Sequence, residues 1–146
     1  MIQLTFPKNK VTTRLREDIN EVFDVVRKRW LLLNPEDCIR KNMIQFLISK
    51  NYPASLFAVE KEIKVGELSR RCDIVVYSRN NHPFMIIECK EMKVSLSSKT
   101  LDQILRYHIS VPATYLVITN GSYCYGFKKI NKQFIEINEF PEYDTV

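Results

Sequence analysis

The segment from residue 71 to residue 90 constrains the fold of this chain more than any other part of it. It contains two apolar runs, 71–77 and 84–90, and the residues between them include Asn80 and Asn81, which tolerate the positive φ of a tight turn. Both faces of such a hairpin are apolar through its middle, as in strands that are covered on two sides. We therefore expect an interior hairpin in a sheet that has a further layer on each face.

The rest of the chain provides elements for those layers. Pro35 suits the first position of a helix, and Asn34 can cap it, so the sequence predicts a helix at 35–50. The segment 21–33 fits either a strand or a helix. A second helix is predicted at 99–109, and further strands are predicted at 56–65, 113–119, 123–129 and 134–137. This order of elements predicts an α/β fold with a mixed sheet.

The composition limits both the domain count and the function classes. A chain of 146 residues fits a single domain, 1–146, with a loosely structured basic arm at about 1–16 and an acidic tail at about 136–146. The 22 Lys and Arg against 17 Asp and Glu favour a polyanionic partner. The three glycines are not spaced as a Gly-rich phosphate loop or a dinucleotide fingerprint, so we expect no nucleotide cofactor.

The cysteines and the hydropathy pattern bear on the cellular compartment. The four cysteines lie far apart and only two histidines accompany them, so the sequence predicts neither a zinc site nor disulfides. Residues 1–10 do not read as a secretory signal, and no apolar run approaches the roughly 20 residues of a membrane span. We expect a cytoplasmic protein with no membrane partner.

The charged end of the hairpin carries the functional argument. If Asn80 and Asn81 form a two-residue turn, opposed residues have numbers that sum to 161, so that Tyr77 faces Phe84 and Asp73 faces Glu88. Two carboxylates in opposed positions repel each other. A divalent cation bound by both would reverse the sign of that interaction. The register therefore predicts a metal-binding pair.

Strand alternation places the neighbours of these acids. Lys90 lies two residues after Glu88 and is expected on the same face, whereas Cys72 and Cys89 are expected on the opposite face. An ionic cluster at the mouth of an interior hairpin is typical of an active site. The alternative is a structural network in which the two acids pair with Arg71 and Lys90.

The spacing Asp73…Glu88-Cys89-Lys90 resembles the signature of the PD-(D/E)XK nuclease superfamily. Gln103 and Tyr107 form a Q-x-x-x-Y pair on the following predicted helix, which resembles an additional motif of RecB-type nucleases and of type I restriction enzyme R subunits. Other interpretations are open for both residues. The segment 100–103 also fits a helix capping box, and Tyr107 also fits a core aromatic residue.

Longer stretches at 35–40, 58–61, 102–107 and 119–121 resemble the N-terminal nuclease domain of those R subunits, and most of all its small stand-alone bacterial versions. The resemblance implies a restriction-endonuclease-like fold, a mixed sheet flanked by helices with an α-β-β-β-α-β core. The chain departs from the family pattern at Cys72, where proline often precedes the first acid, and at residues 91–92, where a small residue and proline are common.

The resemblance also implies a chemistry, the Mg²⁺- or Mn²⁺-dependent hydrolysis of a DNA phosphodiester. Asp73, Glu88 and the backbone carbonyl of Cys89 would hold the ion through hard oxygen ligands. Lys90 would orient the attacking water or neutralise charge on the phosphorane. On the next helix, Gln103 would position the nucleic-acid backbone and Tyr107 would brace the helix.

Several further residues are weaker candidates. Glu60 and Glu36 are candidate additional carboxylates, although a solvated surface role fits both equally well. The basic residues Arg27, Lys28, Arg29 and Lys93 are candidate phosphate contacts. The two histidines, His82 and His108, are attributed to the surface or to core packing.

The expected partners are DNA and either a second copy of the chain or a separate restriction or helicase subunit. The prediction from the sequence is an endonuclease in restriction, defence or DNA processing. Two alternatives remain open at this point: a non-catalytic nucleic-acid-binding or assembly module that retains the fold, and a structural subunit that binds a protein through its acidic tail and the strand at 134–137.

Overall fold

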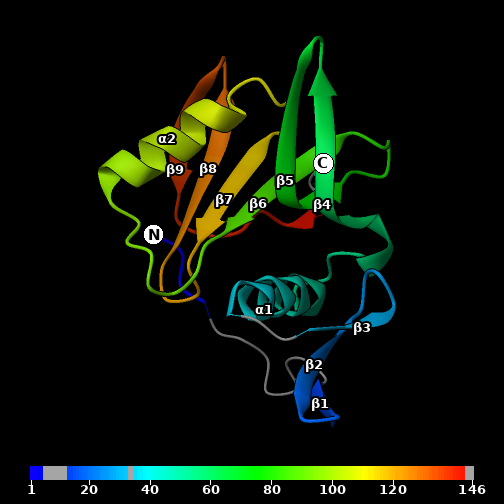
Figure 1. Cartoon of the computed structure of the whole chain (residues 1–146). Helices are drawn as coiled ribbons and strands as arrows, with labels where there is room; N and C mark the ends of the chain where they lie inside the picture. Colours follow the sequence, from blue (N-terminus) through cyan, green and yellow to red (C-terminus); the bar gives the residue numbers. More distant parts are fainter. Residues whose placement is uncertain (5–12, 33–34, 144–146) are drawn as a thin grey trace.

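The computed structural model describes residues 1–4, 13–32 and 35–143, so the predicted cap Asn34 lies outside the described residues. Its main sheet has six strands in the order β4-β5-β6-β7-β8-β9 (Figure 1). All neighbouring strands are antiparallel except β6 and β7, which are parallel. The strands are β4 (Phe57–Val65), β5 (Leu68–Tyr77), β6 (Pro83–Cys89), β7 (Tyr115–Thr119), β8 (Cys124–Ile130) and β9 (Gln133–Ile137).

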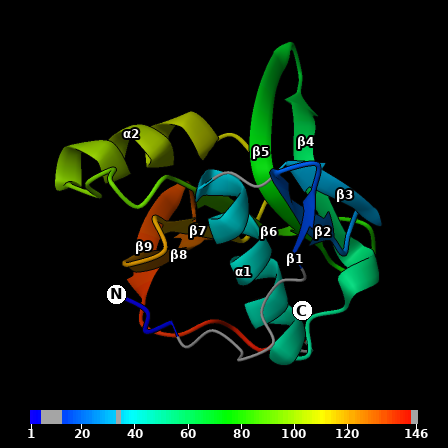
Figure 2. The same ribbon diagram turned by 60° about the horizontal axis from the view of Figure 1, so that its bottom comes forward.

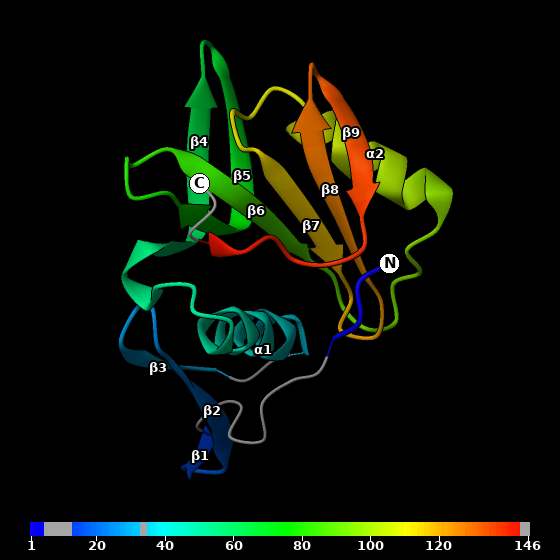
Figure 3. The same ribbon diagram turned by 180° about the vertical axis from the view of Figure 1, so that it is seen from behind.

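Two helices cover this sheet, α1 (Pro35–Ser49) and α2 (Ser98–His108), and a short 3-10 helix (Ala54–Leu56) precedes β4. The order α1, β4, β5, β6, α2, β7 confirms the predicted α/β core. In Figure 1 α2 lies in front of the sheet, and in Figure 3, seen from behind, it lies beyond the strands.

The hairpin of β5 and β6 has a hydrophobic core on each face. On one face the α1 residues Met43 and Leu47 belong to a core with Ile74 and Ile87. On the other face the α2 residues Leu101, Ile104 and Leu105 pack against a core that includes Val75, Ile86, Leu116 and Ile118. Burial on both faces explains why neither strand alternates between polar and apolar residues. The prediction of an interior hairpin is confirmed.

The predicted register of this hairpin is confirmed through its middle and wrong at its turn. Ile74 pairs with Ile87 and Val75 pairs with Ile86, as the expected sum of 161 requires. The ladder then shifts by one residue between Val76 and Tyr77, so that Tyr77 pairs with Pro83 and not with Phe84. The turn is wider than two residues, because the Ser78 N–H donates to the His82 carbonyl.

Strand alternation breaks beside the first acid, and this break reverses the prediction for Cys72. Ile74 belongs to the core under α1, whereas Cys72 belongs to the core under α2 together with Val75. The β4–β5 ladder pairs Val59 with Ile74 and Lys61 with Cys72 but skips the positions between them, where Glu60 has a φ of 52°. A left-handed residue in a strand disrupts the local pleat. Cys89 lies on the α1 face, as predicted.

A second, three-stranded sheet lies beside α1 (Figure 2). Its strands are β1 (Thr13–Arg16), β2 (Ile19–Asp24) and β3 (Arg29–Leu32), which decides the ambiguous segment 21–33 in favour of strand. The small sheet also corrects the prediction of a loosely structured arm at 1–16, because Thr13–Arg16 pairs with β2. The two strands are joined by a turn in which Glu17 and Asp18 both have positive φ. The part of the arm at 5–12 lies outside the described residues.

Both ends of the described chain pack on the main body. Ile2 is buried, and its N–H donates to the Cys124 carbonyl. At the other end, the Tyr143 hydroxyl donates to the Tyr77 carbonyl, and the Tyr52 hydroxyl donates to the Pro141 carbonyl. The acidic tail thus joins the core through its aromatic residues. Among the described helices, none has the length and apolar character that crossing a membrane requires.

Candidate functional site

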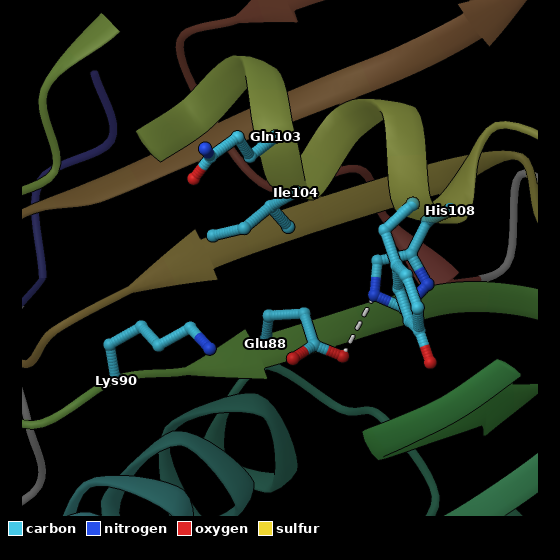
Figure 4. Close-up of a pocket in the computed structure, with 6 residues that line it drawn as sticks. Glu88, Lys90, Gln103, Ile104 and His108 are labelled. Atoms are coloured by element: carbon cyan, nitrogen blue, oxygen red, sulfur yellow. Dashed lines mark ion pairs between the residues drawn. The ribbon is translucent and has the colours of Figure 1, made fainter. Parts of the chain in front are cut away.

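A pocket of about 270 Å³ lies between the end of β6 and the inner face of α2 (Figure 4). Glu88 lies on β6 and Lys90 directly follows the end of that strand, and both line the pocket. This confirms that the two side chains share a face. The α2 residues that line it are Gln103, Ile104, Tyr107 and His108. The pocket forms because α2 crosses the sheet where β6 ends, so that its side chains meet the ionic residues of the hairpin.

Asp73 lies next to Glu88 and is held by the β6 backbone. Its Oδ2 accepts a hydrogen bond of 2.8 Å from the Cys89 N–H. Burial and the neighbouring Glu88 carboxylate raise the pKa of Asp73 from 3.8 to about 7, and only the Cys89 hydrogen bond opposes them. The charge of Glu36 adds to the increase in the pKa of Asp73. Glu36 therefore shares the electrostatic environment of this acid pair.

The raised pKa has a simple physical meaning. Two carboxylates share a partly dry site, and in the part of the chain that the structure describes neither acid forms an ion pair with Arg71 or Lys90. The alternative of a structural network with these two cations is therefore not supported. Arg71 instead lies 3.6 Å from Glu60.

Glu88 also contacts His108, a residue that sequence reasoning assigned to packing. His108 Nε2 lies 3.0 Å from Glu88 Oε1, and the side chain of His108 is only 2% exposed. The contact lacks the alignment of a hydrogen bond, because among the described residues the buried Glu88 Oε1 has no hydrogen-bond partner. The second ring nitrogen of His108, Nδ1, is also buried without one. A signal for this position existed. His108 lies four residues after Ile104, on the same inner face of the helix.

Gln103 and Tyr107 reach the pocket as the motif predicted. The capping-box alternative for Gln103 is wrong, because the N-cap of α2 is Ser97, whose side chain accepts from the Thr100 N–H. Tyr107 is not a core residue, since it is 44% exposed. The Arg70 guanidinium lies 4.6 Å from the centroid of its ring. Both α2 residues are therefore accessible to a ligand.

Glu60 lies in an arginine cluster rather than beside the two acids. Its carboxylate is 2.5 Å from Arg27 and 3.2 Å from Arg40, and Arg71 is the third cation. These cations hold the pKa of Glu60 below its ordinary value, with the Arg27 hydrogen bond as the largest cause. The negative charge of Glu60 is thus neutralised within the protein. Of the two additional carboxylates, only Glu36 acts on the acid pair.

The predicted phosphate contacts differ in how free their charges are. Arg27 is paired with Glu60 and with Asp24. Lys28 and Arg29 are exposed on the small sheet. Lys93 is 82% exposed and lies 3.2 Å from Glu91, in the loop between β6 and α2. His82 is exposed in the turn before β6, away from the pocket.

The donor set near Asp73 fits a hard divalent cation. Asp73 and Glu88 provide carboxylate oxygens that repel each other when both are ionised, which a cation would relieve. The thiol of Cys89 is directed into the core under α1, and burial holds its pKa well above the ordinary value. The role predicted for Cys89 belongs to its backbone carbonyl, at the end of β6 beside β7.

A mixed sheet between two helices, with paired acids and a lysine at the end of its central hairpin, defines an α/β nuclease-like fold. The family described as type I restriction enzyme R protein N terminus matches residues 35–141. The chain belongs to this family. The match begins with α1 and spans every strand of the main sheet, while the small sheet precedes it. Comparison with curated proteins finds none that matches the chain.

Proposed function

We propose that the chain cleaves DNA phosphodiester bonds in a Mg²⁺- or Mn²⁺-dependent reaction at the pocket of Glu88 and Lys90. The observation that carries this proposal is the juxtaposition of the Asp73 and Glu88 carboxylates, which raises the pKa of Asp73 to about 7. A pair of acids that disfavour their own ionisation is poised to bind a cation. Membership in the restriction enzyme R protein family supports the same reading.

Asp73, Glu88 and the Cys89 carbonyl would hold the ion, and Glu36 is a candidate for a further ligand. When bound, such an ion supplies Lewis-acid polarisation of the phosphate and a water of lowered pKa. The Cys89 N–H keeps Asp73 in place by donating to Oδ2. This hydrogen bond leaves the second carboxylate oxygen of Asp73 for a ligand.

Lys90 would act on the reacting phosphate. It lines the same pocket as Glu88, and neither acid forms an ion pair with it among the described residues. An ammonium group of this kind can orient the attacking water or stabilise the negative charge of the phosphorane. Gln103 would hold the backbone of the nucleic acid through its amide, since its side chain is exposed at the pocket. Tyr107 would brace that end of α2.

DNA and the other subunits of a restriction system are the proposed partners. The exposed cations Lys28, Arg29 and Lys93 would contact phosphates outside the pocket. Arg27 is a weaker candidate, because its charge is already paired with Glu60. A contact of this kind positions DNA without reading its sequence.

The test is the variant Lys90→Ala, compared with Lys64→Ala, which removes an exposed lysine from β4. We expect Lys90→Ala to lose Mg²⁺-dependent nicking of plasmid by a factor of about 10² or more. DNA affinity in Ca²⁺ and the melting temperature should stay near wild type, because the lysine acts mainly on developing charge. Lys64→Ala should retain all three properties.

Nicking at the wild-type rate by Lys90→Ala would refute the assignment of this lysine. The alternative function would be identified by two results together. The chain would bind DNA without any Mg²⁺-dependent nicking, and its DNA affinity would not change when Asp73 is replaced by Ala. That alternative is a nucleic-acid-binding or assembly module that retains the nuclease fold.

A further inference from the structure

Three potential metal ligands of different chemistry meet on the α2 side of the acid pair. The ligand atoms of Cys72, Glu88 and His108 all lie within 4.8 Å of one another. Cys72 comes from β5, Glu88 from β6 and His108 from the last turn of α2, so the cluster ties the hairpin to the helix. All three residues are buried, with exposed fractions of 0% for Cys72, 8% for Glu88 and 2% for His108.

The cluster contains polar atoms that the protein itself does not satisfy. Among the described residues, the buried Glu88 Oε1 has no hydrogen-bond partner, and it lies 3.0 Å from His108 Nε2. Within the part of the chain that the structure describes, the Cys72 thiol donates a single long hydrogen bond, of 3.9 Å, to the Arg70 carbonyl. Leaving a buried polar atom without a partner is costly, and a bound ion is one of the groups that would remove this cost.

The chemistry of the three groups selects a soft or borderline cation. From these contacts we infer that Cys72, Glu88 and His108 form a binding site for Zn²⁺ or a similar thiophilic divalent ion. Thiolate, imidazole and carboxylate are the ligands that zinc takes in proteins, whereas Mg²⁺ prefers oxygen ligands alone. The thiolate and the carboxylate together carry two negative charges, which would neutralise the ion.

The geometry requires only small movements. In a tetrahedral zinc site with bonds of about 2.0–2.3 Å, neighbouring ligand atoms are roughly 3.3–3.8 Å apart. The present limit of 4.8 Å is about 1 Å wider. The pocket between β6 and α2 is lined by Glu88 and His108 and gives water access to the remaining coordination position.

This site shares Glu88 with the hard-cation site of the proposed function, and the consequence for regulation rests on that proposal. A zinc ion on Glu88 would withdraw one ligand from the Mg²⁺ site and place two positive charges beside it. Each ion should therefore weaken the binding of the other. The sequence predicted no zinc site, because Cys72, Glu88 and His108 are far apart along the chain and follow no ligand spacing.

The experiment is a titration of the purified full chain with Cd²⁺, followed by the thiolate-to-cadmium charge-transfer absorbance in the ultraviolet. We expect one equivalent to give the signal in the wild type, in Cys38→Ser and in Asp73→Asn. Cys38→Ser controls for the half-exposed thiol on α1. Asp73→Asn removes a ligand of the proposed Mg²⁺ site and leaves the cluster of Cys72, Glu88 and His108 intact. The signal should disappear in Cys72→Ser, and Zn²⁺ should displace Cd²⁺ in the wild type.

His108→Asn provides a second test that does not depend on the folding of a Cys72 variant. We expect its affinity for Cd²⁺ to fall by at least tenfold. The inference is overturned by a signal that persists in Cys72→Ser, by one that is lost in Cys38→Ser or Asp73→Asn, or by unchanged affinity in His108→Asn.

A separate measurement addresses regulation. Zn²⁺ should inhibit Mg²⁺-dependent nicking by the wild type, and Cys72→Ser should remove that inhibition at the same Mg²⁺ concentration. Equal inhibition of both proteins would refute this antagonism between the two sites. If no variant nicks DNA while the cadmium signal behaves as expected, the proposed function fails and the soft metal site stands.

Discussion

At the scale of single residues, Asp73 links the site to the stability of the protein. Its pKa is raised in the folded state, because burial and Glu88 disfavour its charge. An acid of this kind destabilises the fold when it is ionised and not when it is protonated. The penalty is absent below the unfolded pKa near 3.8, grows as the pH rises through the interval up to about 7, and is constant above it.

We therefore expect Asp73→Asn to be more stable than the wild type at pH 8, by on the order of 2 kcal/mol. The asparagine oxygen can still accept from the Cys89 N–H, and its amide can donate to Glu88. Urea unfolding of both proteins between pH 4 and pH 8, without divalent ions, measures the difference. The gain should shrink toward pH 4, and a gain that does not depend on pH would contradict the assigned pKa.

The residue scale also shows how one backbone angle changes a site. Glu60 has a positive φ and lies at the position that the β4–β5 ladder skips. Cys72 belongs to the next pair of that ladder, and its side chain turns toward Glu88. With regular alternation Cys72 would point into the core under α1. The thiol would then lie away from His108.

At the scale of elements, α2 provides four of the six residues that line the pocket, and its first turn is held by a cap. The Ser97 side chain accepts from the Thr100 N–H, one of the donors that a helix leaves unsatisfied at its start. Gln103 follows one turn later, so the cap helps to set where this side chain lies.

We expect Ser97→Ala to lower the free energy of unfolding by about 1 kcal/mol. Ser98→Ala is the matched control, because Ser98 is the exposed first residue of the helix and serves as no cap. Chemical denaturation of the two variants measures the effect. Equal stability of Ser97→Ala and Ser98→Ala would show that the cap contributes nothing.

At the scale of the whole molecule, one buried ion pair fastens the small sheet to the main body. Lys41 of α1 lies 2.7 Å from Asp24 of β2, and both side chains are almost completely buried. Asp24 also accepts from the Val26 and Arg27 N–H groups. These hydrogen bonds and Lys41 hold the pKa of Asp24 below its ordinary value against the effect of burial.

Replacing Lys41 by Met leaves the charge of Asp24 buried without its cation. We expect a loss of about 3 kcal/mol in the free energy of unfolding at pH 7. The double variant with Asp24→Asn should recover a large part of this loss, since the amide oxygen can still accept the two N–H groups. Denaturant unfolding of the single and double variants tests the coupling. Additive losses would mean that the pair does not act as a unit.

Much of the main fold could be predicted from local pattern. The apolar runs around Ile74 and Ile87 identified an interior hairpin, and the two-residue period of a strand placed Glu88 and Lys90 on one face. Pro35 marked the start of α1. The resemblance of the Q-x-x-x-Y pair to a family motif implied that Gln103 and Tyr107 lie near the site, and both line the pocket. A capping box was the alternative for Gln103, and Ser97 proved to be the cap. The hairpin, the shared face of Glu88 and Lys90 and the start of α1 depend on backbone geometry within a few residues, which the sequence determines by itself.

Other features were decided only by the tertiary structure. The contact of His108 with Glu88 depends on where α2 crosses the end of β6, and no local pattern encodes that position. Cys72 faces the same cluster because the ladder is interrupted next to Glu60, whose left-handed conformation nothing in its neighbours marks. The sequence by itself determined which side chains share a face wherever a strand or helix is regular. Which of them meet across elements was decided by packing, because that depends on long-range contacts rather than on local periodicity.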